Sequence, residues 1–157
     1  MSENRIGRIV AISVSKRKGI KKSNVNSANL LENHGIVGDV HAGNWHRQVS
    51  ILALESIDKM RSQGLDNLIP GDFAENITTE FINVQAINLR TLIKIGESTI
   101  LEITQIGKEC HHRCAIYQAV GDCVMPREGI FARVIKSGKI YVNDKIEILE
   151  VKKNVEL

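Results

Sequence analysis

Three cysteines, two histidines and an arginine are crowded into one short stretch of the chain. Two thiols, two imidazoles and a guanidinium occupy the five consecutive residues Cys110-His111-His112-Arg113-Cys114, and Cys123 follows nine residues later. These are all the cysteines of the 157-residue sequence. Cysteines that serve only as small core residues would be scattered along the chain. Their clustering therefore indicates metal binding or thiol chemistry.

Two interpretations of the cluster use more than one cysteine. A structural zinc site would take Cys110, Cys114, Cys123 and an imidazole from His111 or His112, since zinc prefers four tetrahedral sulfur and nitrogen ligands. Structural zinc motifs usually contain two close pairs of ligands, whereas this chain has one C-x₃-C pair and a single cysteine. A redox pair of Cys110 with Cys114 is the other interpretation, although C-x-x-C is the more natural spacing.

The third interpretation is an activated thiol at Cys114. Its neighbours His112 and Arg113 can supply positive charge, which favours the nucleophilic thiolate. A thiolate carries sulfur as a persulfide, or it binds a soft metal such as molybdenum or copper. The same residues therefore suit both sulfur transfer and metal ligation.

Two further stretches hold polar residues suited to ligand binding. Ser15-Lys16-Arg17-Lys18-Gly19 combines three cationic side chains with a glycine and suits an oxyanion. The alternative for it is a solvated, lysine-rich turn. Gly35–Gly43 carries three glycines, which indicates tight turns or close approach to a ligand, and it contains His41. His46 and Arg47 follow, and each lone histidine is more often hydrogen-bonded at a surface than a ligand.

Apolar patterns predict a mostly β chain with one main helix over about Ala53–Gln63. Strands are expected at Arg5–Val14, Gln48–Leu52, Phe73–Thr79, Thr91–Ile95, Ser98–Ile106, Gly129–Lys136, Ile140–Val142 and Lys145–Val151. Ser23–Leu31 is polar and is expected to be irregular. Many short strands with turn signals predict a largely antiparallel β-barrel with short helical turns.

Asn76 stands out because it falls within the expected strand Phe73–Thr79. Asparagine is depleted in strands. Its side chain therefore meets either a structural hydrogen-bond partner or a ligand.

Length and composition predict a single domain over residues 1–151, with 152–157 as a frayed tail. A net charge of +3 is too small for a broad nucleic-acid-binding surface. No apolar run approaches the roughly 18 residues of a membrane span, and the N-terminus lacks the apolar core of a signal peptide. We therefore expect a cytoplasmic protein whose thiols stay reduced.

Three blocks of the sequence resemble the MOSC family, which is named after the C-terminal domain of molybdenum cofactor sulfurase. They are Gly71–Thr78, Gln105–Cys114 and Gly121–Phe131, and they occur in the family's order. Gly38–Gly43 is also similar to the family's pocket lining. The resemblance extends from about residue 5 to residue 150 and implies a MOSC-type β-barrel that handles the molybdenum cofactor, a molybdopterin.

The resemblance also implies roles for the cysteine cluster. In this family a cysteine either accepts sulfur from a cysteine desulfurase or binds molybdenum. The Cys-x-Arg-Cys-Ile stretch of the mitochondrial amidoxime reducing component is similar to residues 112–116, which selects Cys114 over Cys110 as the metal or sulfur thiol. Arg113 and His112 would then hold the thiolate. Cys110 and Cys123 are additional thiols that serve as a sulfur relay or have no role.

The cofactor-binding residues implied by the resemblance come from several parts of the chain. Ser15, Lys16, Arg17 and Lys18 are expected at the cofactor's phosphate, and His41, Arg47 and Asn76 are expected to line its pocket. No pyridoxal phosphate site is expected in this chain.

The function implied is sulfur transfer or cofactor sulfuration through a thiolate or persulfide. The alternatives are a molybdenum-dependent reductase of N-hydroxylated compounds, a non-catalytic cofactor or sulfur carrier, and a structural zinc domain. A cysteine desulfurase or a molybdoenzyme is the expected protein partner, with no role for nucleic acid or membrane. The sequence specifies no oligomeric state.

Overall fold

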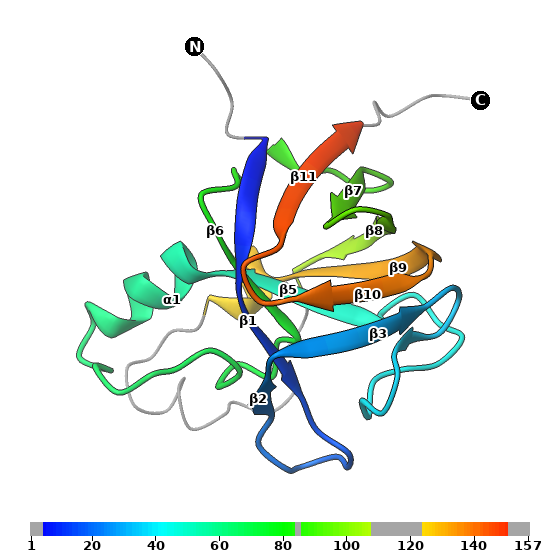
Figure 1. The fold of residues 1–157 in the computed structure, drawn as a ribbon. Helices are drawn as coiled ribbons and strands as arrows, with labels where there is room; N and C mark the ends of the chain where they lie inside the picture. Colours follow the sequence, from blue (N-terminus) through cyan, green and yellow to red (C-terminus); the bar gives the residue numbers. More distant parts are fainter. Residues whose placement is uncertain (1–4, 84–85, 108–123, 151–157) are drawn as a thin grey trace.

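The strands expected from the sequence close into a barrel. A computed structural model describes residues 5–83, 86–107 and 124–150 of the chain, drawn as a ribbon in Figure 1. Within these ranges, seven strands form the barrel in the order β11-β7-β8-β9-β5-β6-β1, and β1 pairs with β11 to close it. Their bounds are β1 Ile6–Val14, β5 Val49–Ala53, β6 Ile77–Glu80, β7 Leu92–Ile95, β8 Thr99–Ile106, β9 Ile130–Lys136 and β11 Lys145–Glu150. Neighbours are antiparallel except β5 and β6, which are parallel, so the predicted fold class is confirmed.

Alternating apolar side chains fill the inside of the barrel. In β8, Thr99, Leu101 and Ile103 are buried and the residues between them are partly exposed, which is the two-residue period of a strand with one face turned inward. All seven strands contribute side chains to the main core, and most of these are isoleucine, leucine or valine. The barrel wall is therefore a fixed frame from which the loops at its ends project.

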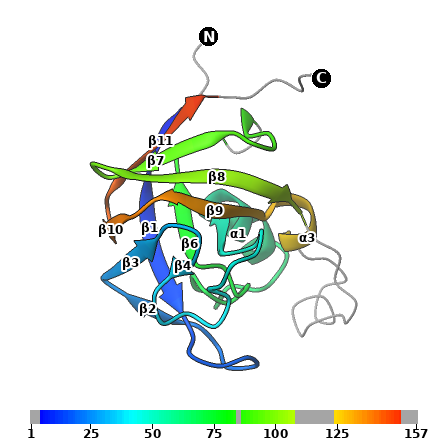
Figure 2. The ribbon, with the colours of Figure 1, turned by 90° about the vertical axis from the view of Figure 1, so that its right-hand side faces the viewer.

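Two helices cover a second, smaller core beside the barrel. They are α1, Leu54–Arg61, and the short α3, Met125–Glu128. The side chain of Glu128 accepts a hydrogen bond from Ser56 Oγ at 2.6 Å and pairs with Lys59 Nζ at 2.9 Å, which joins the two helices. Figure 2 shows both helices at the same end of β9. The apolar residues between them are Leu52, Ile57, Met60, Phe73, Val124, Met125 and Phe131.

The remaining strands lie outside the barrel. β2, Ser23–Val25, pairs with the end of β1, while β10 (Gly138–Tyr141), β3 (Ser27–Leu31) and β4 (Gly35–Ile36) form a three-stranded sheet. The loop from β1 to β2, residues 15–22, lies at the opposite end of β1 from its pairing with β11 (Figure 1). No helix among the described residues is long and apolar enough to cross a membrane.

The expectation of irregular structure over Ser23–Leu31 was wrong, because β2 and β3 lie there. Only Leu30 is buried among the eight residues of these two strands. Edge strands with so few inward side chains lack the alternation by which a strand is recognised. Their pairing partners, β1 and β10, are distant in sequence or follow a polar loop, so only the folded chain reveals them.

The strand expected over Phe73–Thr79 begins later, at Ile77. Residues 71–75 form a turn in which the Ala74 N–H donates to Gly71 O at 2.9 Å and Ala74 adopts a φ of +64°. The cause is Glu75, whose carboxylate accepts the N–H groups of Gly71 and Phe73 and so competes with strand pairing. The other expected elements agree with the structure to within a few residues at each end.

Candidate functional site

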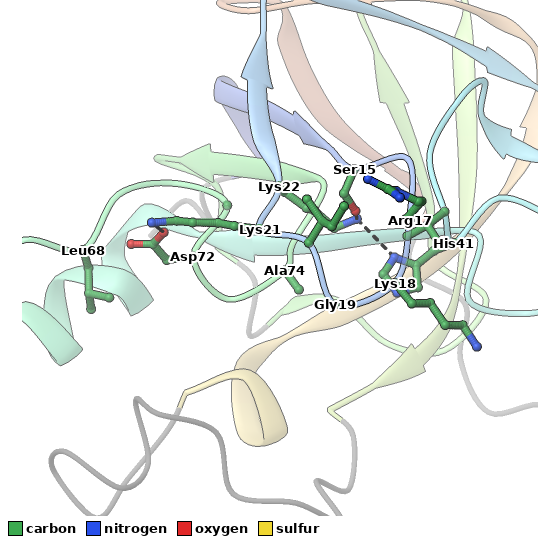
Figure 3. A pocket seen from close by; sticks show the side chains of 13 residues that line it. Ser15, Arg17, Lys18, Gly19, Lys21, Lys22, His41, Leu68, Asp72 and Ala74 are labelled. Atoms are coloured by element: carbon green, nitrogen blue, oxygen red, sulfur yellow. Dashed lines mark hydrogen bonds and ion pairs between the residues drawn. The ribbon is translucent and has the colours of Figure 1, made fainter.

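Two adjoining cavities lie at the end of the barrel that carries the loop 15–22. We call the larger, about 580 Å³, the basic cavity, and Figure 3 shows its side chains. The smaller, about 290 Å³, is the aromatic cavity. Lys18, His41 and Ala74 line both, so the two cavities adjoin. The aromatic cavity is further lined by Trp45, Arg47, Ser50, Met125 and Phe131.

The basic loop predicted from the sequence forms one wall of the basic cavity. Arg17 and Lys18 are exposed and line it, and neither side chain has an ionic or hydrogen-bond partner among the described residues. Ser15 also lines the cavity but is buried. Lys16 is exposed and lines neither cavity. The structure therefore brings three of the four predicted phosphate-binding residues to one hollow.

A buried ion pair ties this loop to the glycine-rich stretch. Lys22 Nζ lies 2.8 Å from Asp39 Oδ1, and the two side chains are 1% and 0% exposed. The same carboxylate accepts the N–H groups of Ser15 at 3.0 Å and His41 at 3.1 Å. Burial raises the pKa of Asp39, but the nearby His41 imidazole and the hydrogen bonds from the Lys22 ammonium and the Ser15 N–H outweigh it and hold that pKa well below its usual range. Asp39 is therefore an ionised carboxylate that holds the loop 15–22 against the stretch Gly35–Gly43.

A second buried carboxylate, Glu75, stabilises the turn 71–75, whose residues Gly71, Asp72 and Ala74 line the basic cavity. It is 0% exposed and accepts hydrogen bonds from the N–H groups of Gly71 and Phe73 and from the Thr78 hydroxyl, at 2.8 to 3.1 Å. Burial raises the pKa of Glu75, and these hydrogen bonds offset only part of that rise. Gly71 has a φ of +99°, where a Cβ would lie 2.9 Å from Ser13 Oγ. The turn thus requires both the carboxylate and the glycine.

Replacing Glu75 with glutamine is expected to lower the free energy of unfolding by about 1–3 kcal/mol, because an amide NH₂ must then face the N–H of Gly71 or Phe73. Since the pKa of Glu75 is raised in the folded state, wild-type stability falls as the pH rises above the ordinary value of about 4.3. The glutamine variant lacks this dependence, so the difference in free energy of unfolding between it and the wild type should be largest in acid. Urea unfolding of both proteins between pH 4 and 8 measures this difference. An equal difference at all pH values would contradict the raised pKa of Glu75, and the exposed Glu97→Gln is the control.

Asn76 lies at the back of the site and lines neither cavity. Its Oδ1 accepts from the N–H and Oγ of Ser50 at 3.0 and 3.2 Å, and its Nδ2 donates to Ser13 O at 3.0 Å. The amide therefore bridges β5 and β1, which is the structural alternative foreseen for it. Its link to the site passes through Ser50, which lines the aromatic cavity.

Arg47 is held between two aromatic rings in the aromatic cavity. Its guanidinium carbon lies 4.9 Å from the centroid of Trp45 and 5.6 Å from that of Phe131. The Trp45 indole N–H donates to His41 O at 2.8 Å, which fixes the ring. Arg47 Nε is buried and has no hydrogen-bond partner in the part of the chain that the structure describes. The Arg47 guanidinium thus lies beside two aromatic faces, and one of its donors, Nε, is covered by protein and unpaired within the described residues.

The predicted sulfur residues, Cys110 and Cys114 with His112 and Arg113, lie outside the described residues, as does Cys123. On either side of this segment, Gly107 donates its N–H to Gly129 O at 2.6 Å, and Met125 lines the aromatic cavity. No group of three or more potential metal-binding side chains occurs within the described ranges, which contain no cysteine.

Sequence reasoning did not single out several residues of the site. Asp39 occurs within the recognised stretch Gly35–Gly43 and Lys22 lies just beyond Ser15–Gly19, but nothing in their spacing indicates that they pair. The apolar side chains of Trp45, Met125 and Phe131 carry no sequence signal that separates a cavity wall from a core. Each would have been found only by knowing which strand ends lie together.

Comparisons with known proteins agree with this architecture. The family model described as MOSC domain matches residues 38–147. Among solved structures, the YuaD protein from Bacillus subtilis is similar with a TM-score of 0.76 and 16% identity, over 91% of this chain and 95% of that one. YiiM from Escherichia coli has a TM-score of 0.66 and 16% identity, over 94% and 72%. YiiM from Geobacillus stearothermophilus has 0.69 and 17%, over 92% and 75%. At these identities the likeness shows the fold alone, and no curated protein sequence matches significantly.

Proposed function

Because the chain belongs to the MOSC domain family, we propose that it binds the molybdenum cofactor across the two cavities and takes part in sulfur transfer through a cysteine thiolate or persulfide. One observation carries this proposal. Three cationic side chains, Arg17, Lys18 and Arg47, line the two adjoining cavities and have no carboxylate partner among the described residues. Such an excess of positive charge suits an anionic ligand.

The basic cavity suits the phosphate of molybdopterin. Two of its lysines are neutralised by the protein itself, since Lys21 pairs with Asp72 at 2.8 Å and Lys22 pairs with Asp39. The spare charge therefore belongs to Arg17 and Lys18. Arginine matches phosphate geometry with a fork of N–H donors, and lysine adds a point charge.

The aromatic cavity suits the ring system of the same ligand. Arg47 lines this cavity with its guanidinium beside the rings of Trp45 and Phe131. A guanidinium offers several N–H donors for the acceptor atoms of a pterin ring. The flat faces of Trp45 and Phe131 offer apolar contact to a planar ring, and the Ser50 hydroxyl adds a polar group.

Cys114 completes the proposal as the soft ligand or sulfur carrier, with Arg113 and His112 favouring its thiolate and Cys110 as a second thiol. When bound, the cofactor supplies a molybdenum centre that bears sulfur ligands and changes oxidation state. The chain's own residues hold the phosphate, fix the ring and keep the thiol ionised. Sulfur would come from a cysteine desulfurase partner, or pass to a molybdoenzyme.

A second candidate function is reduction of N-hydroxylated compounds. The observation that favours it is the aromatic cavity, whose apolar lining of Trp45, Met125 and Phe131 exceeds the needs of a sulfur carrier. Supplying cofactor, a reductant and a hydroxylamine-type compound separates the two. Turnover supports the reductase, and tight cofactor binding without turnover supports the carrier.

Replacing Lys18 or Arg47 with alanine is expected to weaken cofactor binding roughly 10- to 100-fold, because each removes a charge-assisted hydrogen bond to the ligand. The molybdenum and pterin contents of protein purified from a host that makes the cofactor measure this. Lys136→Ala removes an equal charge from the exposed end of β9 and should leave both contents unchanged. Wild-type pterin content in Lys18→Ala and Arg47→Ala together would refute the proposed site.

A further inference from the structure

The Lys22 ammonium contacts more than its carboxylate partner. Its Nζ lies 3.1 Å from Nδ1 of His41 and 3.4 Å from Ser15 Oγ, in addition to 2.8 Å from Asp39 Oδ1. Figure 3 shows Lys22, Ser15 and His41 converging at one side of the basic cavity. A fully buried lysine is rare unless paired, and this one also touches a histidine that lines both cavities.

The contact determines which nitrogen of His41 carries the proton. An ammonium has three donors and no acceptor, so Nδ1 must present its lone pair to Lys22. The neutral ring then carries its proton on Nε2. Asp39 Oδ2 lies 3.6 Å from the same Nδ1, which is too long for a hydrogen bond, and that oxygen already accepts the backbone N–H of His41.

The cations around His41 act in the same direction, whereas the Asp39 carboxylate opposes them. A proton on Nδ1 would point at the Lys22 ammonium, and Arg17 and Lys18 line the same basic cavity. Asp39 is the carboxylate in contact, and it is engaged by Lys22 and by backbone N–H groups. Trp45 also donates to the backbone carbonyl of His41, which holds the backbone at this residue.

We propose that Lys22 is a positioning residue that holds His41 in the Nε2–H form, so that His41 acts toward a bound ligand as a hydrogen-bond donor. This selects ligands that place an acceptor atom, such as a phosphate oxygen or a ring carbonyl, beside His41. The tautomer is a property of the protein alone. Only the identity of the ligand rests on the proposed function.

The test observes the imidazole nitrogens directly, by ¹H–¹⁵N correlation through two and three bonds on the full chain labelled at histidine. His41→Gln identifies the His41 signals. The wild type is expected to show a protonated Nε2 and an unprotonated Nδ1. In Lys22→Met the donor is lost and Asp39 alone faces Nδ1, so the proton is expected to move to Nδ1. The neighbouring Lys21→Met removes an equal charge that does not contact His41, and should keep the wild-type pattern.

Lys22→Met leaves the Asp39 carboxylate buried without a counter-charge. The double variant Lys22→Met/Asp39→Asn avoids this because it removes both charges together. It is expected to show a mixture of the two tautomers. Persistence of the Nε2–H pattern in either variant that folds, or an Nδ1–H pattern in the wild type, overturns the proposal.

The pterin content of the same preparations separates this inference from the proposed function. If His41 donates to the cofactor, His41→Phe should lower the content roughly 2- to 10-fold, the effect of one hydrogen bond. An unchanged content in His41→Phe overturns the donor role toward that ligand. Wild-type protein with the Nε2–H pattern but no pterin or molybdenum refutes the proposed cofactor and supports the relation between Lys22 and His41.

Discussion

Replacing Cys114 with serine is expected to abolish molybdenum retention, or persulfide formation, in protein from a host that makes the cofactor. A serine hydroxyl stays protonated near neutral pH and is a hard ligand, whereas soft metals and transferable sulfur require a thiolate. Elemental analysis for molybdenum, together with pterin fluorescence, measures the first effect. Labelling with a persulfide-selective reagent measures the second.

Metal analysis of Cys114→Ser and the wild type separates the activated thiol from the structural zinc site. Cys123→Ser removes a thiol from the same segment and should leave molybdenum content near that of the wild type. If Cys114→Ser retains molybdenum at the wild-type stoichiometry, the assignment is wrong. Stoichiometric zinc without molybdenum or pterin in the wild type would instead favour the Cys₃His site.

Replacing Asp39 with asparagine is expected to lower the free energy of unfolding by about 3–5 kcal/mol, because it leaves the Lys22 ammonium buried without a counter-charge. For a domain of this size the midpoint of thermal unfolding should fall by about 6–20 °C. Pterin content should fall as well, since Asp39 also accepts the Ser15 N–H that fixes the basic loop. Differential scanning calorimetry and pterin analysis measure the two effects.

Asp58→Asn is the matched control for Asp39→Asn. Asp58 is 57% exposed and pairs with Arg61 on the surface of α1, so its loss should change stability by less than about 1 kcal/mol. Equal midpoints for the two variants would show that the pair of Lys22 with Asp39 contributes no more than an exposed one.

The pH dependence of stability tests the lowered pKa of Asp39. Its pKa is lowered in the folded state, so it stabilises the fold above the ordinary aspartate value of about 3.9 and loses that contribution as the pH falls. When the pH is lowered from 6 to 3, the free energy of unfolding, measured with urea, should therefore fall more for the wild type than for Asp39→Asn. A parallel loss in both proteins would contradict the lowered pKa.

The barrel strands could be predicted from the sequence because each carries its own signal. β1 is rich in β-branched residues, the buried positions at the start of β8 recur every second residue, and Gly96 marks the turn between β7 and β8 with a φ of +63°. The helix α1 likewise follows from the spacing of Ile57 and Met60. These patterns are local, since the side-chain period of a strand or helix is set by backbone geometry alone.

The site could be predicted only in part. The loop Ser15–Lys18, together with His41 and Arg47, was selected by residue type, and the structure brings all of these except Lys16 to the two adjoining cavities. The pairing of Lys22 with Asp39 was not foreseen, because the energy of two buried charges depends on their distance and burial. Both depend on where two loops meet.

Sequence alone determined the fold class of this protein and the chemical groups at its disposal, since strand period and side-chain chemistry are properties of short segments. The tertiary structure decided how those groups are used. It turned Asn76 inward to join β5 to β1, made a turn of residues 71–75, and placed Lys22 against His41. These outcomes depend on contacts between strands and loops far apart in the chain, and such contacts form only when the barrel closes.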